Sequence, residues 1–136
     1  MRLGLLAAVV LVLTACGGHA ARSPEAVARA WSAALDRNDN RGAAALFKSG
    51  AEVVQDTPLV LQGRNDAVRW NRLLPCGGFI QSVEPQGDNE VLVVFTLTER
   101  PGHTCDGPGQ YAAAVFKVEH GKIVLWHQVP PPGPAI

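Results

Sequence analysis

The sequence predicts an α+β domain in which three N-terminal helices pack on one face of an antiparallel sheet. Apolar residues recur at helical spacing through the first part of the domain, and Pro75 ends the last of these segments. From Gly78 onward the chain changes to short apolar runs separated by turns rich in Gly, Pro, Asn and Asp, which is typical of β-strands. Residues 16–136 are enough for one domain with a single core.

The first helix is predicted to begin at Ser23-Pro24-Glu25, because Ser is a good N-cap and Pro suits the first helical position. The second helix is shorter and ends at Ser49-Gly50, and the third follows Gly63. The expected buried faces are, in order, Val27, Trp31, Ala34 and Leu35; Ala43, Leu46 and Phe47; and Ala67, Trp70, Leu73 and Leu74.

Strands are expected at residues 51–54, 59–61, 79–83, 91–98, 111–118 and 123–129. His120-Gly121 is predicted to form a two-residue hairpin turn, in which Gly accepts the required positive φ. Alternate residues of 91–98 are apolar on both faces of the strand, so both faces of the sheet need a cover. The helices cover one face, and a second copy of the chain is expected on the other. A homodimer is therefore the expectation, with a tightly folded monomer as the open alternative.

The N-terminus carries a short apolar segment, residues 3–13, that follows Arg2 and leads to Leu13-Thr14-Ala15-Cys16. This segment is far shorter than the ~20 residues that span a bilayer, and its anatomy is that of a secretory signal. Leu13-Thr14-Ala15-Cys16 resembles the bacterial lipobox, after which the signal is cleaved and the cysteine is lipidated. The opposing interpretation is a buried apolar helix with an incidental cysteine.

The resulting division of the chain is a signal peptide at 1–15, a lipidated tether at 16–23, the domain at 24–129 and a Pro-rich tail at 130–136. The expected location is a bacterial cell membrane, with the protein facing away from the cytoplasm and held by acyl chains on Cys16.

Composition limits the partners and cofactors that we expect. Arg2 is the one charged residue in 1–15, so the rest of the chain holds 11 basic and 12 acidic residues. This balance gives no basic footprint for nucleic acid, and no motif indicates a cofactor. Cys76 and Cys105 form an even pair in a compartment that permits disulfides, and a disulfide between them is expected. The rival interpretation, a metal site with His103, lacks both a standard zinc spacing and a fourth ligand.

The order of elements resembles the nuclear-transport-factor-2-like superfamily, including its SnoaL-like branch. The likeness rests on the first helix with Trp31, on Leu61-Gln62-Gly63-Arg64 and on residues 116–123 leading to Trp126. It implies a cone-shaped bent sheet, antiparallel or mixed, wrapped around the N-terminal helices and enclosing a pocket.

Thr98-Glu99-Arg100 and the segment from Gly121 to Trp126 also resemble limonene epoxide hydrolases. In that family a catalytic aspartate follows the arginine by two residues, and a second follows the tryptophan by two. Gly102 and Gln128 stand at these positions here. Because neither side chain exchanges a proton near neutral pH, the family's reaction is disfavoured.

Candidate site residues follow from this resemblance and from the two-residue period of strands. The residues expected to line the pocket and bind ligand are Trp31, Thr96, Thr98, Arg100, Trp126 and Gln128. Each of these has a plain structural alternative. The tryptophans can fill core volume and the threonines can belong to an ordinary strand. Arg100 lies beside Pro101-Gly102, which favours a solvated strand end.

Three functions are compatible with the sequence. The first is a lipid-anchored domain that binds a small apolar ligand or a protein partner without catalysis. The second is a cofactor-independent SnoaL-like isomerase, cyclase or hydrolase, for which His127 is the weakly supported base and Glu99 or Asp106 could orient it. The third is a degenerate cone that serves only as a dimeric interaction module.

Overall fold

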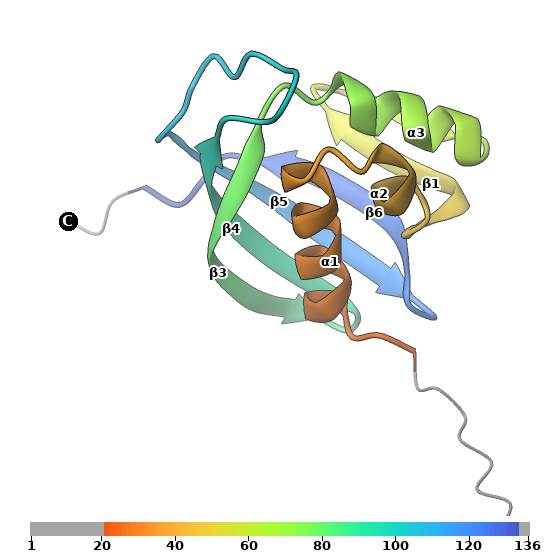
Figure 1. Cartoon of the computed structure of the whole chain (residues 1–136). Coiled ribbons are helices and arrows are strands. Elements are labelled where there is room, and N and C mark those ends of the chain that lie inside the picture. The colour runs from red at the N-terminus through yellow and green to blue at the C-terminus, as the bar shows by residue number, and fades with distance from the viewer. Residues whose placement is uncertain (1–20, 134–136) are drawn as a thin grey trace, which may run out of the picture.

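A computed structural model describes residues 21–133 of the chain. Three helices, α1, α2 and α3, lie on one face of a six-stranded sheet (Figure 1). The elements are α1 Pro24–Asp36, α2 Asn40–Ala44, β1 Phe47–Gln55, β2 Thr57–Leu61, α3 Arg64–Leu73, β3 Gly77–Gly87, β4 Glu90–Thr98, β5 Tyr111–Glu119 and β6 Lys122–Val129. The predicted α+β class is confirmed.

The strand order is β2-β1-β6-β5-β4-β3. Neighbouring strands are antiparallel, except that β1 and β6 run parallel, so the sheet is mixed. The last hairpin forms as predicted, because His120 and Gly121 both adopt positive φ, at 49° and 75°. Together with the helices on its inner face, the curled sheet gives the cone-shaped architecture that the sequence predicts.

The predicted signal at 1–15, Cys16 and most of the tether lie outside the described residues, as do residues 134–136. Within residues 21–133, no helix is both long and apolar enough to cross a membrane.

Helix α1 begins and buries its residues as the sequence predicts. The Ser23 hydroxyl accepts a hydrogen bond from the Ala26 amide at 3.1 Å and caps the first turn. The buried face contains the four predicted apolar residues and adds two small ones, Ala28 and Ser32. At its C-terminal end the helix lies close to β3, because Asp36 Oδ1 accepts from the Gly78 amide at 3.0 Å. A Cβ on the adjacent Gly77 would lie 2.6 Å from the same Asp36 oxygen, so a larger residue there would push this carboxylate aside.

The second helix is shorter than predicted. It ends at Ala44, and Phe47 begins β1 instead of lying on a helical face. Pairing of this segment with β2 and β6 overrides its local helical pattern. Gly50, expected to end the helix, has a φ of 87° and lies at the register shift between Phe47 and Glu52.

The buried face of α3 also differs from the prediction at one position. Leu73 is 73% exposed, whereas Asn71 is fully buried. Ala67, Trp70, Asn71 and Leu74 follow the spacing i, i+3, i+4, i+7, so Leu73 falls on the opposite side of the helix. The apolar face that the sequence predicts does not include Asn71. Its burial is explained by two hydrogen bonds at 2.8 Å, one from Trp31 Nε1 to Asn71 Oδ1 and one from Asn71 Nδ2 to the Ala67 carbonyl.

Arg100 is not at a solvated strand end, because only 2% of it is exposed. Its Nη1 donates to the Asn71 and Leu74 carbonyls at 2.7 Å each, which satisfies the C-terminal end of α3. Its Nη2 donates to Asn40 Oδ1 on α2. Burial lowers the pKa of the Arg100 guanidinium from its ordinary value, and the charge of Asp36 raises it in part. We name this set of side chains (Trp31, Asn40, Asn71 and Arg100) the polar hub.

The outer face of the sheet has no helix over it in the described residues (Figure 1). Phe79 and Tyr111 flank Thr96 in register on this face and are 64% and 62% exposed. Apolar surface of this kind is consistent with the predicted homodimer, which stays a prediction.

Replacing Arg100 with Met should lower the free energy of unfolding by roughly 2–4 kcal/mol, because two buried carbonyls lose a charged donor. Urea denaturation measures the change. Arg72→Met is the matched control, since Arg72 lies on α3 itself and its side chain is exposed, and it should change stability by less than about 0.5 kcal/mol. Equal effects of the two substitutions would contradict the role given to Arg100.

Candidate functional site: an apolar pocket

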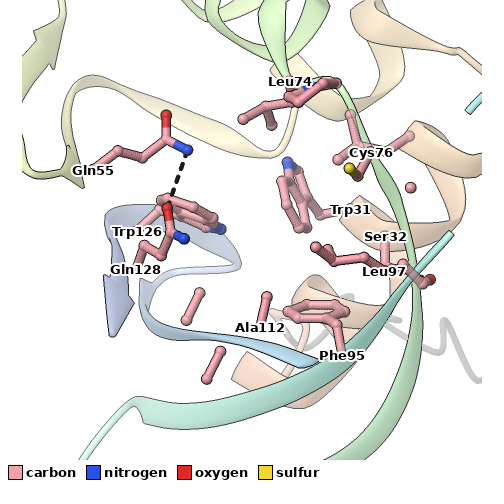
Figure 2. Close-up of a pocket in the computed structure, with 16 residues that line it drawn as sticks. Trp31, Ser32, Gln55, Leu74, Cys76, Phe95, Leu97, Ala112, Trp126 and Gln128 are labelled. Atoms are coloured by element: carbon pink, nitrogen blue, oxygen red, sulfur yellow. Dashed lines mark hydrogen bonds between the residues drawn. The ribbon is translucent and has the colours of Figure 1, made fainter. Parts of the chain in front are cut away.

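A pocket of about 170 Å³ lies between the inner face of the sheet and the helices (Figure 2). Its walls come from the middle of α1, the segment that follows α3, and the ends of β1, β4, β5 and β6 that lie near Gln55 and Gln128. The apolar side chains that line it are Trp31, Leu35, Leu74, Pro75, Phe95, Leu97, Ala112, Ala113, Ala114 and Trp126.

The two indoles belong both to the pocket wall and to the core. Trp31 packs against Phe95, Phe116 and Trp126 with ring centroids 6.2, 5.4 and 5.9 Å apart. Trp126 in turn contacts Trp70 edge to face at 5.0 Å. The Trp31 indole N–H donates to Asn71 Oδ1, and this bond fixes the position of the ring in the pocket wall.

Few polar side chains reach this pocket. Gln55 Nε2 donates to Gln128 Oε1 at 3.2 Å, and Figure 2 shows this pair beside Trp126. The Ser32 hydroxyl is occupied, because it donates to the Gly78 carbonyl at 3.1 Å. Trp126 Nε1 has almost no solvent-accessible surface and has no hydrogen-bond partner within the described part of the chain.

Of the six residues expected to bind ligand, the structure brings three together in the pocket: Trp31, Trp126 and Gln128. Thr96, Thr98 and Arg100 are not in the lining. The strand register explains the two threonines, because the odd residues of β4, such as Phe95, face the helices and the even ones face outward. Thr96 Oγ1 accepts from Gln81 Nε2 at 2.7 Å, and Arg100 belongs to the polar hub.

Sequence reasoning missed Gln55, Phe95 and Leu97 as lining residues. Phe95 and Leu97 share the apolar odd face of the strand with Val91 and Val93, but Leu92 and Val94 make the even face apolar as well, so alternation alone does not single out the inward face. Gln55 follows Val53 by two residues at the end of β1, but the parallel pairing that sets this strand beside β6 has no local sequence signal.

The acid and base candidates do not line the pocket. Glu99, Asp106 and His127 are all exposed, and His127 is on the outer face of β6, one residue from Trp126. Among the described lining residues there is no carboxylate, imidazole, amine or guanidinium.

The predicted Cys76–Cys105 disulfide is confirmed. The rival metal grouping is therefore excluded for these two cysteines, because their sulfurs are bonded to each other. The third member of that grouping, His103, bonds to backbone oxygens, with Nε2 2.7 Å from the Arg72 carbonyl. In residues 21–133, no three His, Cys, Asp or Glu side chains gather closely enough to hold a metal ion.

The disulfide also shapes the pocket. Cys76 lines it together with Pro75 and Gly77, and Cys105 belongs to the loop between β4 and β5. The bond thus ties this loop to the wall segment between α3 and β3.

The fold is shared with solved structures of NTF2-like proteins. An NTF2-like protein of unknown function from Cytophaga hutchinsonii is 11% identical, with a TM-score of 0.63 over 79% of this chain and 88% of that one. A protein provisionally named a ketosteroid isomerase, from Kribbella flavida, is 19% identical, with a TM-score of 0.60 over 81% and 83% of the two chains. An LEH-like epoxide hydrolase from M. tuberculosis is 19% identical, with a TM-score of 0.57 over 77% and 80%.

Identities this low establish the NTF2-like fold and leave the activity open. No protein-family model matches the sequence, and no curated protein matches it.

Replacing both Cys76 and Cys105 with Ser should lower the free energy of unfolding by roughly 3–4 kcal/mol, since the bond closes a loop of 29 residues. Denaturation of the double variant under oxidising conditions measures the loss. Reductant should lower the stability of the unaltered protein by a similar amount and leave the double variant unaffected. If reductant destabilises both proteins equally, the disulfide is not the cause.

Proposed function

We propose that this domain binds a small, largely apolar molecule in the pocket that Trp31, Phe95 and Trp126 help to line and does not transform it chemically. The observation that carries the proposal is the chemistry of the lining, which combines apolar side chains with two uncharged amides. Pockets of this composition, with few polar groups that fix orientation, are typical of small-molecule sites. The volume of about 170 Å³ is comparable to that of engineered apolar cavities of about 150 Å³ that bind benzene.

The alternative is a cofactor-independent isomerase, cyclase or hydrolase, in line with the names of some structural neighbours. General acid–base catalysis needs a titratable group within hydrogen-bond reach of the reacting atom. The described lining offers none, and Gln128 occupies the position that the epoxide hydrolase resemblance gives to an aspartate. Binding is therefore the better-supported proposal.

Native mass spectrometry of protein purified from a bacterial envelope should detect a retained small molecule. Ala112→Phe should abolish this retention, because Ala112 lines the pocket and a phenyl ring there would fill it. Ala33→Phe adds the same ring at an exposed position on α1 and should keep the ligand. The proposal fails if the unaltered protein carries no ligand and also takes up no added apolar probe.

We further propose that the chain is a lipoprotein of a bacterial cell membrane, anchored through Cys16 and facing outside the cytoplasm. The support is the signal-like segment that leads to Cys16. The disulfide agrees with this location, since such bonds persist in oxidising compartments.

Cys16→Ala should abolish incorporation of a fatty-acid label and release the protein from the membrane fraction. Cys76→Ser is the matched control, because it removes a cysteine that is bonded within the domain and should leave the label in place. Continued labelling and unchanged fractionation of Cys16→Ala would refute the anchor.

A further inference from the structure

The Trp126 indole N–H is an unsatisfied donor at the wall of the pocket. The ring is only 6% exposed, and Nε1 has no partner in residues 21–133. Trp31, which packs against Trp126, differs in this respect, because its N–H donates to Asn71 Oδ1 at 2.8 Å. Figure 2 shows the Trp126 nitrogen on the side of the ring toward Trp31. A buried donor without a partner is costly, so an acceptor delivered by a ligand would be favoured at this point.

A second donor lies two residues along the same strand. Gln128 Oε1 is engaged by Gln55, and Figure 2 shows the Gln128 amide nitrogen directed toward the pocket. Trp126 and Gln128 lie on the same face of β6, because side chains two residues apart in a strand point the same way. The indole N–H of Trp126 and the amide N–H of Gln128 are therefore two neighbouring hydrogen-bond donors on one wall of the pocket, which we call the donor track.

Charge decides which acceptor fits this track. No charged side chain lines the described pocket, so a ligand carboxylate would enter an apolar site without a cation to compensate it. An uncharged oxygen avoids this cost and still accepts from an indole or amide N–H.

From these observations we propose that the ligand is uncharged and largely apolar, and that it presents a carbonyl or ether oxygen to Trp126 Nε1 and Gln128 Nε2. This assignment rests on the proposed binding function and adds the chemical class of the molecule. Because Nε1 has almost no accessible surface in the free protein and Trp31 packs against the ring, the hydrogen bond requires one of the two indoles to shift when the ligand enters.

Three probes of nearly equal size test the assignment: acetophenone, its hydrocarbon analogue cumene and its carboxylate analogue benzoate. The protein is the chain from residue 16 onward with Cys16→Ser, which contains every described element. The chain has three tryptophans, so nuclear magnetic resonance should show three indole N–H signals. Trp126→Phe identifies the signal of Trp126 by its loss.

Acetophenone should bind about three- to tenfold more tightly than cumene, the range expected for one net hydrogen bond, and should move the Trp126 signal to lower field. Benzoate should bind more weakly than acetophenone. In Trp126→Phe the preference for acetophenone over cumene should shrink, and the part that remains should come from Gln128. Gln128→Leu, an exposed position that tolerates change, should also reduce the preference for acetophenone and serves if Trp126→Phe does not fold.

The possible failures are distinct. If acetophenone and cumene bind equally and the Trp126 signal does not move, the donor track is wrong while the binding function stands. If benzoate binds most tightly, the uncharged class is wrong. If none of the three probes binds, the proposed binding function itself is overturned.

Discussion

The arrangement of the helices over the sheet depends on one buried group, the polar hub. The side-chain oxygen of Asn71 accepts a hydrogen bond from the Trp31 indole N–H, and the backbone carbonyl of Asn71 accepts one from the Arg100 guanidinium. Arg100 also bonds to Asn40, so the hub connects α1, α2 and α3 with the segment after β4. Buried polar groups are tolerated when they are bonded in this way, and a bonded set of them favours one arrangement over its neighbours. The exception in the hub is the Arg100 Nε–H, which has no partner in the described residues. By holding Trp31, the hub fixes the part of the pocket wall that this ring forms.

Much of the fold follows from local sequence patterns. The capped start of α1, its apolar face, the His120-Gly121 hairpin and the Cys76–Cys105 disulfide were all predictable, since each depends on residues close in sequence or on simple pairing. Local spacing predicts that Phe47 lies on a helical face. The structure places it in a strand, because its pairing partner on β6 is far along the chain. Long-range pairing of this kind overrides local propensity and leaves no local signal.

The site was harder to predict than the fold. Trp31, Trp126 and Gln128 line the pocket, whereas Thr96 and Thr98 fall on the outer face of β4. That strand is apolar on both faces, so its alternation could not indicate which face turns inward. Arg100 shows a different limit. A charged residue beside Pro101-Gly102 is typical of a surface turn, and only the three-dimensional position of the carbonyls at the end of α3 explains its burial.

The NTF2-like fold supplies a hollow, and the residues that line it determine its chemistry. Here the lining consists of aromatic rings, aliphatic groups and amides. Arg100, the charged residue that the sequence predicted in the pocket, is buried outside it and holds the helices together. The central claim is that the pocket lined by Trp31, Phe95 and Trp126 is an accessible apolar cavity. A crystal structure under xenon pressure tests it directly, since xenon enters apolar cavities of this size. We expect a xenon atom in this pocket, beside the two indoles. Side chains that fill this space and exclude xenon would contradict the account.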